Sequence, residues 1–224
     1  MYVCMFSSSD AQGFFFRAVS QFSSPILFQM CSKRTSITWK ELRVLTLARS
    51  NLLPTLSYIS TFSGSKVGDK CPRCGGGAED LAHIVLDCPE SSPSRDEFLE
   101  SVEAALDALV LEVKLPANFV QVSREALLFF VATTHPRPPN MFLPPLTTLW
   151  DFKSAAKNVL AARLGLIPQT LLEVMTLTSP LPQQQTKSIF MQWARSYIST
   201  CAKYTHENWV GRSSDPRVRK AVSS

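Results

Sequence analysis

Apolar side chains recur three and four positions apart along much of the chain, a spacing typical of one buried face of an α-helix. Runs that alternate apolar and polar residues, as half-buried strands do, are scarce. The pattern therefore predicts a mainly α fold. Helices are expected near residues 38–51, 54–62, 94–110, 123–132, 147–165 and 186–206.

Two of the expected helix starts carry capping signals. Thr38 and Glu41 have the T-x-x-E form, and Ser94 and Glu97 have the S-x-x-E form, in which both side chains satisfy backbone N–H groups of the first turn. Pro93 stands just before the second signal and is expected to separate that helix from the preceding one. Both helices should therefore begin at these residues.

Aromatic residues follow the same helical spacing. Trp39 is expected in the apolar stripe of the first helix, and Trp193 and Tyr197 in the stripe of the last one. Aromatic rows can also serve as platforms on which nucleic-acid bases stack. The spacing favours a buried face for Trp193 and Tyr197 over a stacking platform.

Composition limits the class of protein. The 224 residues are 45% hydrophobic and 18% charged, which argues against a disordered chain and suits one or two small domains. No apolar run reaches the ~18 residues that cross a bilayer, so we expect no membrane span. The N-terminal residues lack the basic start and cleavage site of a secretory signal, which predicts an intracellular protein, nuclear or cytoplasmic, although a transit-like segment stays open.

Charge is distributed unevenly along the chain, which carries a net +5 overall. Residues 31–74 hold eight basic and two acidic residues, a net +6, whereas residues 75–115 hold two basic and ten acidic residues, a net −8. Residues 181–224 hold seven basic and two acidic residues, a net +5. The basic segment 31–74 could place a cationic face against phosphates while the acidic helix that follows it looks elsewhere. Alternatively, the blocks 31–74 and 75–115 attract each other within one fold.

One cluster of residues has metal-ligand spacing. Cys71, Cys74, His83 and Cys88 form the pattern C-x2-C-x8-H-x4-C. Two cysteines separated by two residues can turn both sulfurs toward one ion, and glycines after Cys74 permit the tight backbone turn that this requires. An acidic pair, Glu79-Asp80, favours the start of a short helix that carries His83 inward and brings Cys88 round at its last turn.

Three thiolates and one neutral imidazole complete a tetrahedral shell, which predicts a single structural Zn²⁺ ion with no position for substrate water. The alternatives are free cysteines beside a surface histidine, or a redox disulfide between Cys71 and Cys74; the glycines disfavour the latter, because a redox C-x-x-C normally opens a helix. Cys4, Cys31 and Cys201 have no partners at ligand spacing, and Cys201 with His206 could form only half of a second site.

The expected organisation has four parts. They are a poorly structured leader (1–35), a zinc-binding module with flanking amphipathic helices (36–115), a helical C-terminal region (116–210) with a Pro-rich linker (134–146), and a basic tail (211–224).

The cysteine cluster and the residues before it match a family pattern in order. The matching segments are Leu42 to Arg49, Leu53-Pro54-Thr55, Cys71-Pro72-Arg73-Cys74-Gly75, Glu79-Asp80, and Leu81 to Pro89. Together they resemble the zinc-binding segment near the C-terminus of non-LTR retrotransposon reverse transcriptases. The resemblance implies a retroelement-derived fragment, since in that family the segment lies downstream of the polymerase domain and is thought to help hold element RNA or target DNA.

Two functions are expected from these features. The chain lacks the acidic sets of a polymerase, RNase H or endonuclease, so we expect no catalysis. The first function is binding of RNA or DNA through phosphates, without reading of bases. The second is a protein-interaction or purely structural zinc module. The predicted phosphate contacts are Arg43, Arg49, Lys66, Lys70 and Arg73.

Overall fold

The structure is a computed structural model. It describes residues 37–62, 67–113, 115–131, 159–160, 162–167, 179 and 181–223. Several predictions from the sequence lie outside the described residues: the leader, Lys66, the Pro-rich linker, Cys4, Cys31 and most of the helix expected at 147–165.

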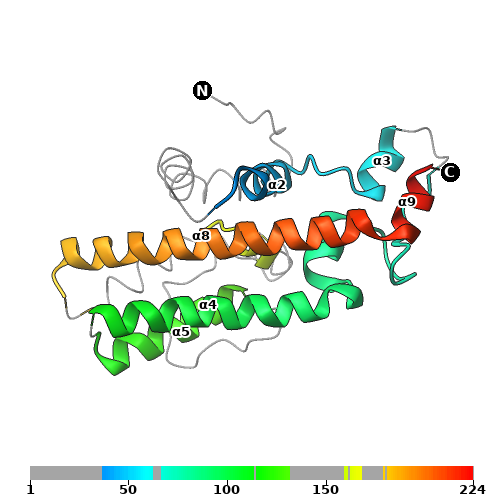
Figure 1. The fold of residues 1–224 in the computed structure, drawn as a ribbon. Coiled ribbons are helices and arrows are strands. Elements are labelled where there is room, and N and C mark those ends of the chain that lie inside the picture. The colour runs from blue at the N-terminus through cyan, green and yellow to red at the C-terminus, as the bar shows by residue number, and fades with distance from the viewer. Residues whose placement is uncertain are drawn as a thin grey trace, which may run out of the picture.

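The described part of the chain is mainly helical, as predicted (Figure 1). It contains no strand, only one isolated antiparallel bridge between Lys70 and Ala78. None of the described helices has the length and hydropathy to cross a bilayer. The helices are α2 (Trp39–Arg49), α3 (Leu56–Phe62), α4 (Ser92–Val113), α5 (Ala117–Val131), α8 (Gln183–Ser214) and α9 (Pro216–Ser223), with a π-helical turn η1 (His83–Asp87) and a 3₁₀ turn η2 (Pro89–Ser91).

Helix α8 is the central helix against which other described helices pack. With 32 residues it is about 48 Å long. Helices α2 and α4 pack along it, so elements far apart in the sequence share one core (Figure 1). Trp193 and Tyr197 are each 2% exposed, which confirms their predicted place in the core. Other buried apolar residues of α8 recur at helical spacing: Ile189, Phe190, Ala194, Ile198, Cys201 and Ala202.

Helix α2 begins with the predicted capping box. The Thr38 N–H donates to Glu41 Oε2 at 2.6 Å, and the Glu41 N–H donates to Thr38 Oγ1 at 3.3 Å. Leu45 is buried against the core as expected. The prediction for Trp39 is wrong, because its side chain is 75% exposed. Trp39 lies on the exposed face of α2 with Arg43, whereas the buried face carries Leu42 and Leu45.

Helix α4 does not begin with the predicted capping box at Ser94. It begins at Ser92, directly after the 3₁₀ turn, so Pro93 lies in its first turn. Proline is tolerated there because the first N–H groups of a helix have no intrahelical partner. The turn and the helix are therefore continuous, and the Arg95 Nη1 donates back to the carbonyl of Cys88 at 2.7 Å.

The segment 211–224, predicted as a basic tail, is helical in most of its described residues. Helix α8 crosses the expected boundary at 210/211 and ends at Ser214. The Asp215 carboxylate then accepts the Arg217 N–H at 2.9 Å, which starts α9. Residues 211–214 and 216–223 are thus helical, with Asp215 between them, and α9 packs against α8.

Arg49 is part of the core, contrary to its predicted role at a phosphate-binding surface. It is 8% exposed, and its Nε and Nη2 donate to the carbonyls of Leu164 and Gly165 at 2.7 and 2.8 Å. Burial lowers the pKa of Arg49 to about 10. A Cβ on Gly165 would lie 2.8 Å from Arg49 Nη2, and the φ of Gly165 is +73°. Arg49 therefore links α2 to the segment that carries Leu164 and Gly165, and its buried guanidinium does not face a phosphate-binding surface.

Candidate metal centre

A tight loop presents the first two cysteines. The Gly75 N–H donates to the Cys71 carbonyl at 2.9 Å, with Gly75 in the left-handed region at φ +68°. The Cys71 N–H donates to the Gly77 carbonyl at 3.0 Å, which closes the loop at its base. The Gly76 N–H donates to Cys74 Sγ at 3.3 Å. We call residues 70–78 the knuckle; its backbone points donors at a sulfur, as a thiolate turn requires.

The other two ligands come from a widened helical turn. Asp80 Oδ1 accepts the His83 N–H at 2.7 Å and starts the helix, and the Cys88 N–H reaches the His83 carbonyl at 2.7 Å across the π-helical turn η1. In an α-helix, residues five apart point about 140° away from each other. The wider turn brings His83 and Cys88 to one side. The sequence predicted the helix and both ligands but not this widening, which is frequent at functional sites.

The four predicted ligand atoms converge. Cys71 Sγ and Cys88 Sγ are 4.0 Å apart, Cys74 Sγ and His83 Nε2 are 3.3 Å apart, and all four atoms lie within 4.8 Å of one another. A tetrahedral ion with metal–sulfur distances of about 2.3 Å separates its ligand atoms by about 3.6 to 3.8 Å. The group fits one metal ion, and the cysteines are free thiols without the alternative disulfide.

Burial differs among the ligands. Cys71 and Cys88 are each 1% exposed, whereas Cys74 and His83 are partly exposed. Burial raises the pKa of Cys71 to about 11. Burial also acts to raise the pKa of Cys74, but the Gly76 N–H and the neighbouring thiols lower it below its ordinary value. A bound dication favours the ionised form of every thiol, because cysteine binds metals as thiolate.

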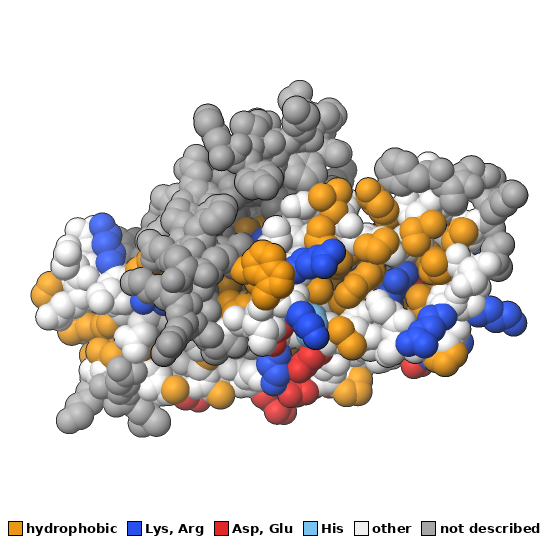
Figure 2. All heavy atoms as spheres, turned by 45° about the horizontal axis from the view of Figure 1, so that its top comes forward, with side chains coloured by type: hydrophobic (Ala, Val, Ile, Leu, Met, Phe, Trp, Pro, Cys, Tyr) orange, Lys and Arg blue, Asp and Glu red, His pale blue; other side chains and the backbone are white. Residues whose placement is uncertain are grey.

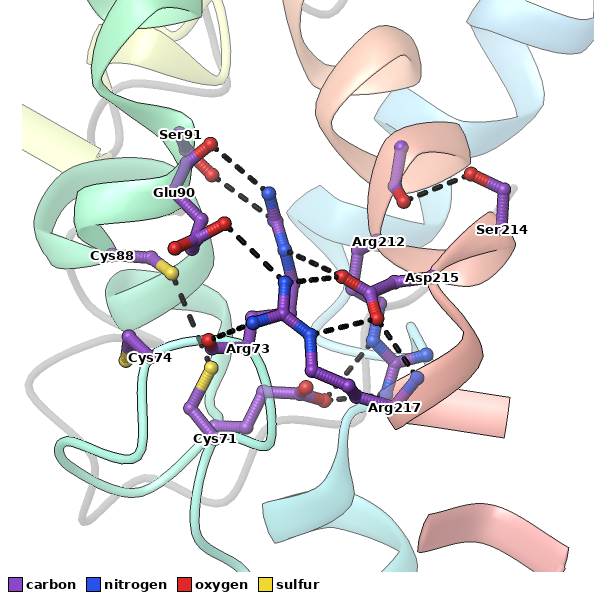
Figure 3. Close-up of polar contacts among 12 residues, drawn as sticks. Cys71, Arg73, Cys74, Cys88, Glu90, Ser91, Arg212, Ser214, Asp215 and Arg217 are labelled. Carbon is purple, nitrogen blue, oxygen red and sulfur yellow. Dashed lines mark hydrogen bonds and ion pairs between the residues drawn. The ribbon is translucent and has the colours of Figure 1, made fainter. Parts of the chain in front are cut away.

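Arg73 lies between the first two cysteines and is held inside the protein. Its Nη2 donates to the Glu90 carbonyl at 3.0 Å, its Nη1 donates to Ser91 Oγ at 3.3 Å, and its Nε forms an ion pair with Asp215 at 3.7 Å (Figure 3). The side chain is only 12% exposed. Arg73 therefore joins the knuckle to η2, and its predicted role at a phosphate-binding surface is not compatible with these contacts.

Helix α9 contacts the knuckle through Arg217. The Arg217 Nη1 donates to the Arg73 carbonyl at 2.6 Å, and its Nη2 pairs with Glu90 Oε2 at 3.3 Å and Asp215 Oδ2 at 2.8 Å (Figure 3). The hydrogen bond from Arg217 lowers the pKa of Asp215 to about 2. The charge pattern of the sequence indicates a basic C-terminal segment but does not link it to the candidate metal ligands.

A buried ion pair between Glu79, which directly follows the knuckle, and Arg212 of α8 supports the knuckle. Glu79 is 0% exposed, and its Oε1 accepts from Arg212 Nε at 3.0 Å, from Arg212 Nη2, and from the Leu56 N–H at 3.1 Å. Arg212 also lies over the Trp209 ring, 4.7 Å from its centroid. The sequence assigned Glu79 to the start of the short helix, but only Asp80 has that role. Glu79 instead joins the knuckle to α3 and α8.

Of the predicted phosphate-binding residues that the structure describes, two are exposed and two are held inside the fold. Arg43 on α2 and Lys70 in the knuckle are exposed, while Arg49 and Arg73 serve the fold. The half-site suggested for Cys201 does not form: Cys201 is fully buried, and the single Cys/His/Asp/Glu group in the described residues that could hold a metal is the one at the knuckle.

No protein-family model, curated protein or solved structure matches the chain. The resemblance to retrotransposon reverse transcriptases thus stays an expectation based on the residue pattern. The class of site comes from its own chemistry: three cysteines and one histidine at the spacing of a single ion, held within a helical fold.

Proposed function

We propose that the chain is a structural zinc module without catalytic activity, derived from a retroelement protein, that binds RNA or DNA. The observation that carries this proposal is the convergence of three thiols and one imidazole within 4.8 Å. This donor set suits Zn²⁺ and leaves no coordination position for a substrate or water. The retroelement origin is supported by the C-P-x-C-G and L-x-H patterns, since their donors are the ones that converge.

Native mass spectrometry with and without a chelator tests the metal. We expect one zinc ion per chain, lost on chelation and absent from Cys88→Ser, while Cys201→Ala keeps it because Cys201 lies outside the cluster. A chain that retains no metal, or a Cys88→Ser variant that retains it, contradicts the zinc module.

The surface of α2 supports the nucleic-acid part of the proposal. Arg43 lies one turn after Trp39 on the same side of the helix, and Arg43, Trp39 and Lys40 are all exposed. Figure 2 shows Lys and Arg side chains beside hydrophobic ones on this side of the molecule. Cations attract the phosphates, and an exposed aromatic ring stacks on an unpaired base. This combination of cations and an exposed aromatic ring favours binding of single-stranded RNA or DNA.

A gel-shift titration on single-stranded RNA at about 50 and about 200 mM salt tests this interface. The Lys40→Gln/Arg43→Gln variant should bind more weakly, with a salt slope lower by about 1.4, because two phosphate contacts are lost. Trp39→Ala should weaken single-strand binding by about 1 to 3 kcal/mol and leave duplex binding unchanged. Lys187→Gln, which removes an exposed cation from α8, is the matched control. Binding that ignores salt contradicts the proposal.

The second candidate is a protein-interaction module, favoured by a groove between α4 and α5. Apolar side chains line it, with Arg124 and Asp107 paired at its edge. A partner captured by pull-down should survive nuclease treatment and be lost in Val120→Lys. Unchanged helicity by circular dichroism controls for folding. Capture that depends on RNA contradicts this candidate. The apolar lining residues are Val110, Leu115, Ala117, Val120 and Leu128.

A further inference from the structure

The start of α9 and the metal centre share one network of polar contacts. We call Asp215 and Arg217 the C-terminal clamp. Arg217 donates to the main-chain carbonyl of Arg73 and pairs with Glu90, while Asp215 pairs with the Arg73 side chain (Figure 3). Arg217 is 144 residues from Arg73 and 127 residues from Glu90 in the sequence. The contacts are therefore tertiary and not a feature of the helix alone.

The position of the contacted groups relates the clamp to the metal ligands. Arg73 lies between Cys71 and Cys74, so its carbonyl belongs to the backbone that orients both sulfurs. Glu90 lies two residues after Cys88, and the Arg73 side chain donates to its carbonyl. Arg217 thus contacts the knuckle, which carries Cys71 and Cys74, and also Glu90, which follows Cys88.

We infer that Arg217 and Asp215 are outer-sphere positioning residues of the metal centre, so that metal binding and docking of α9 stabilise each other. The inference rests on the proposed zinc module. Groups that orient metal ligands without touching the ion typically change its affinity about 10- to 100-fold. Coupling between two binding events is reciprocal, so the ion favours docked α9 as much as docked α9 favours the ion.

Other contacts of the clamp serve α9 itself and do not explain the link. The Asp215 carboxylate caps α9 through the Arg217 N–H, and the Arg219 N–H donates to the Asp215 carbonyl at 3.1 Å. These bonds are within residues 215–219 and would exist without a knuckle. The side chain of Arg217, by contrast, donates to the knuckle. Its loss should change metal affinity, whereas loss of the exposed Lys220 on the same helix should not.

Metal affinity of the full chain tests the inference. Zn²⁺ is titrated in competition with a chromogenic chelator, and Co²⁺ spectra report the geometry of the site. We expect Arg217→Gln to bind Zn²⁺ at least about 10-fold more weakly than the unmodified chain, and Lys220→Gln, with the same change of charge, to bind equally well. Arg217→Lys keeps the charge but loses the forked donor, so an intermediate affinity is expected and gives a milder variant should Arg217→Gln not fold.

Hydrogen exchange supplies the reciprocal measurement. Removal of the metal should increase exchange of α9 amides more than that of amides near Trp193 in the middle of α8. Equal affinities for the unmodified chain, Arg217→Gln and Lys220→Gln would overturn the inference and leave the zinc module intact. Equal exchange of α9 with and without metal would also overturn it. If the unmodified chain binds no metal, both this inference and the proposed zinc module are wrong.

Discussion

Removal of the metal is expected to unfold the knuckle and the turn that carries His83 and Cys88. Zinc-finger peptides gain roughly 10 to 16 kcal/mol from their ion at neutral pH, as much as the whole stability of a small domain. The knuckle has little backbone pairing of its own, one isolated bridge and no strand, so the ion is expected to supply most of its stability besides the side-chain contacts to η2 and α9. Circular dichroism melts with chelator, and then with one equivalent of Zn²⁺, measure the loss and its recovery.

Cys88→Ser should reproduce the effect of the chelator and should not be rescued by added zinc. Cys201→Ala is the matched control: it also removes a buried sulfur, but from α8, and its melting temperature should still rise when zinc is added. A melt that is identical with and without chelator would show that the four side chains converge without an ion.

The second large effect, a loss of unfolding free energy, is expected when the buried Glu79–Arg212 ion pair is broken. Arg212→Leu leaves Glu79 buried without its cation, which typically costs about 3 to 5 kcal/mol. The double variant Glu79→Leu/Arg212→Leu should be less destabilised than Arg212→Leu, because no buried charge is left unpaired. Urea unfolding of the zinc-loaded protein measures the three free energies of unfolding.

Lys203→Leu is the control for the ion-pair experiment. Lys203 and Glu207 form an exposed pair one turn apart on the same helix α8, so the loss should be about 0.5 kcal/mol or less. If Arg212→Leu costs no more than Lys203→Leu, the buried pair does not support the knuckle.

Features that depend on neighbouring residues could be predicted from the sequence. The Thr38 capping box and the set of four candidate ligands depend on spacings within a short segment; the capping box is present, and the four side chains converge as expected. The widened turn could not be predicted, because it depends on how His83 and Cys88 meet the knuckle. The start of α4 was placed at Ser94, since the sequence does not tell whether a 3₁₀ turn ends or continues into a helix.

Roles of the charged residues could not be predicted. A sequence shows that Arg49 and Arg73 are cations, but not that carbonyls from distant segments face them. Their place in a basic segment predicts phosphate contacts for both. The opposite charge blocks do meet in part, since Arg212 and Arg217 of the C-terminal block pair with Glu79 and Glu90 of the acidic one.

The place of α8 in the chain has a consequence for biosynthesis. Translation of Val113 completes α2, α4 and the four candidate ligands. Helix α8, which covers the apolar faces of α2 and α4, ends only at Ser214. At elongation rates of about 5 to 20 residues per second, the interval between these points is roughly 5 to 20 s. During this interval the apolar faces of α2 and α4 that pack on α8 stay uncovered by it.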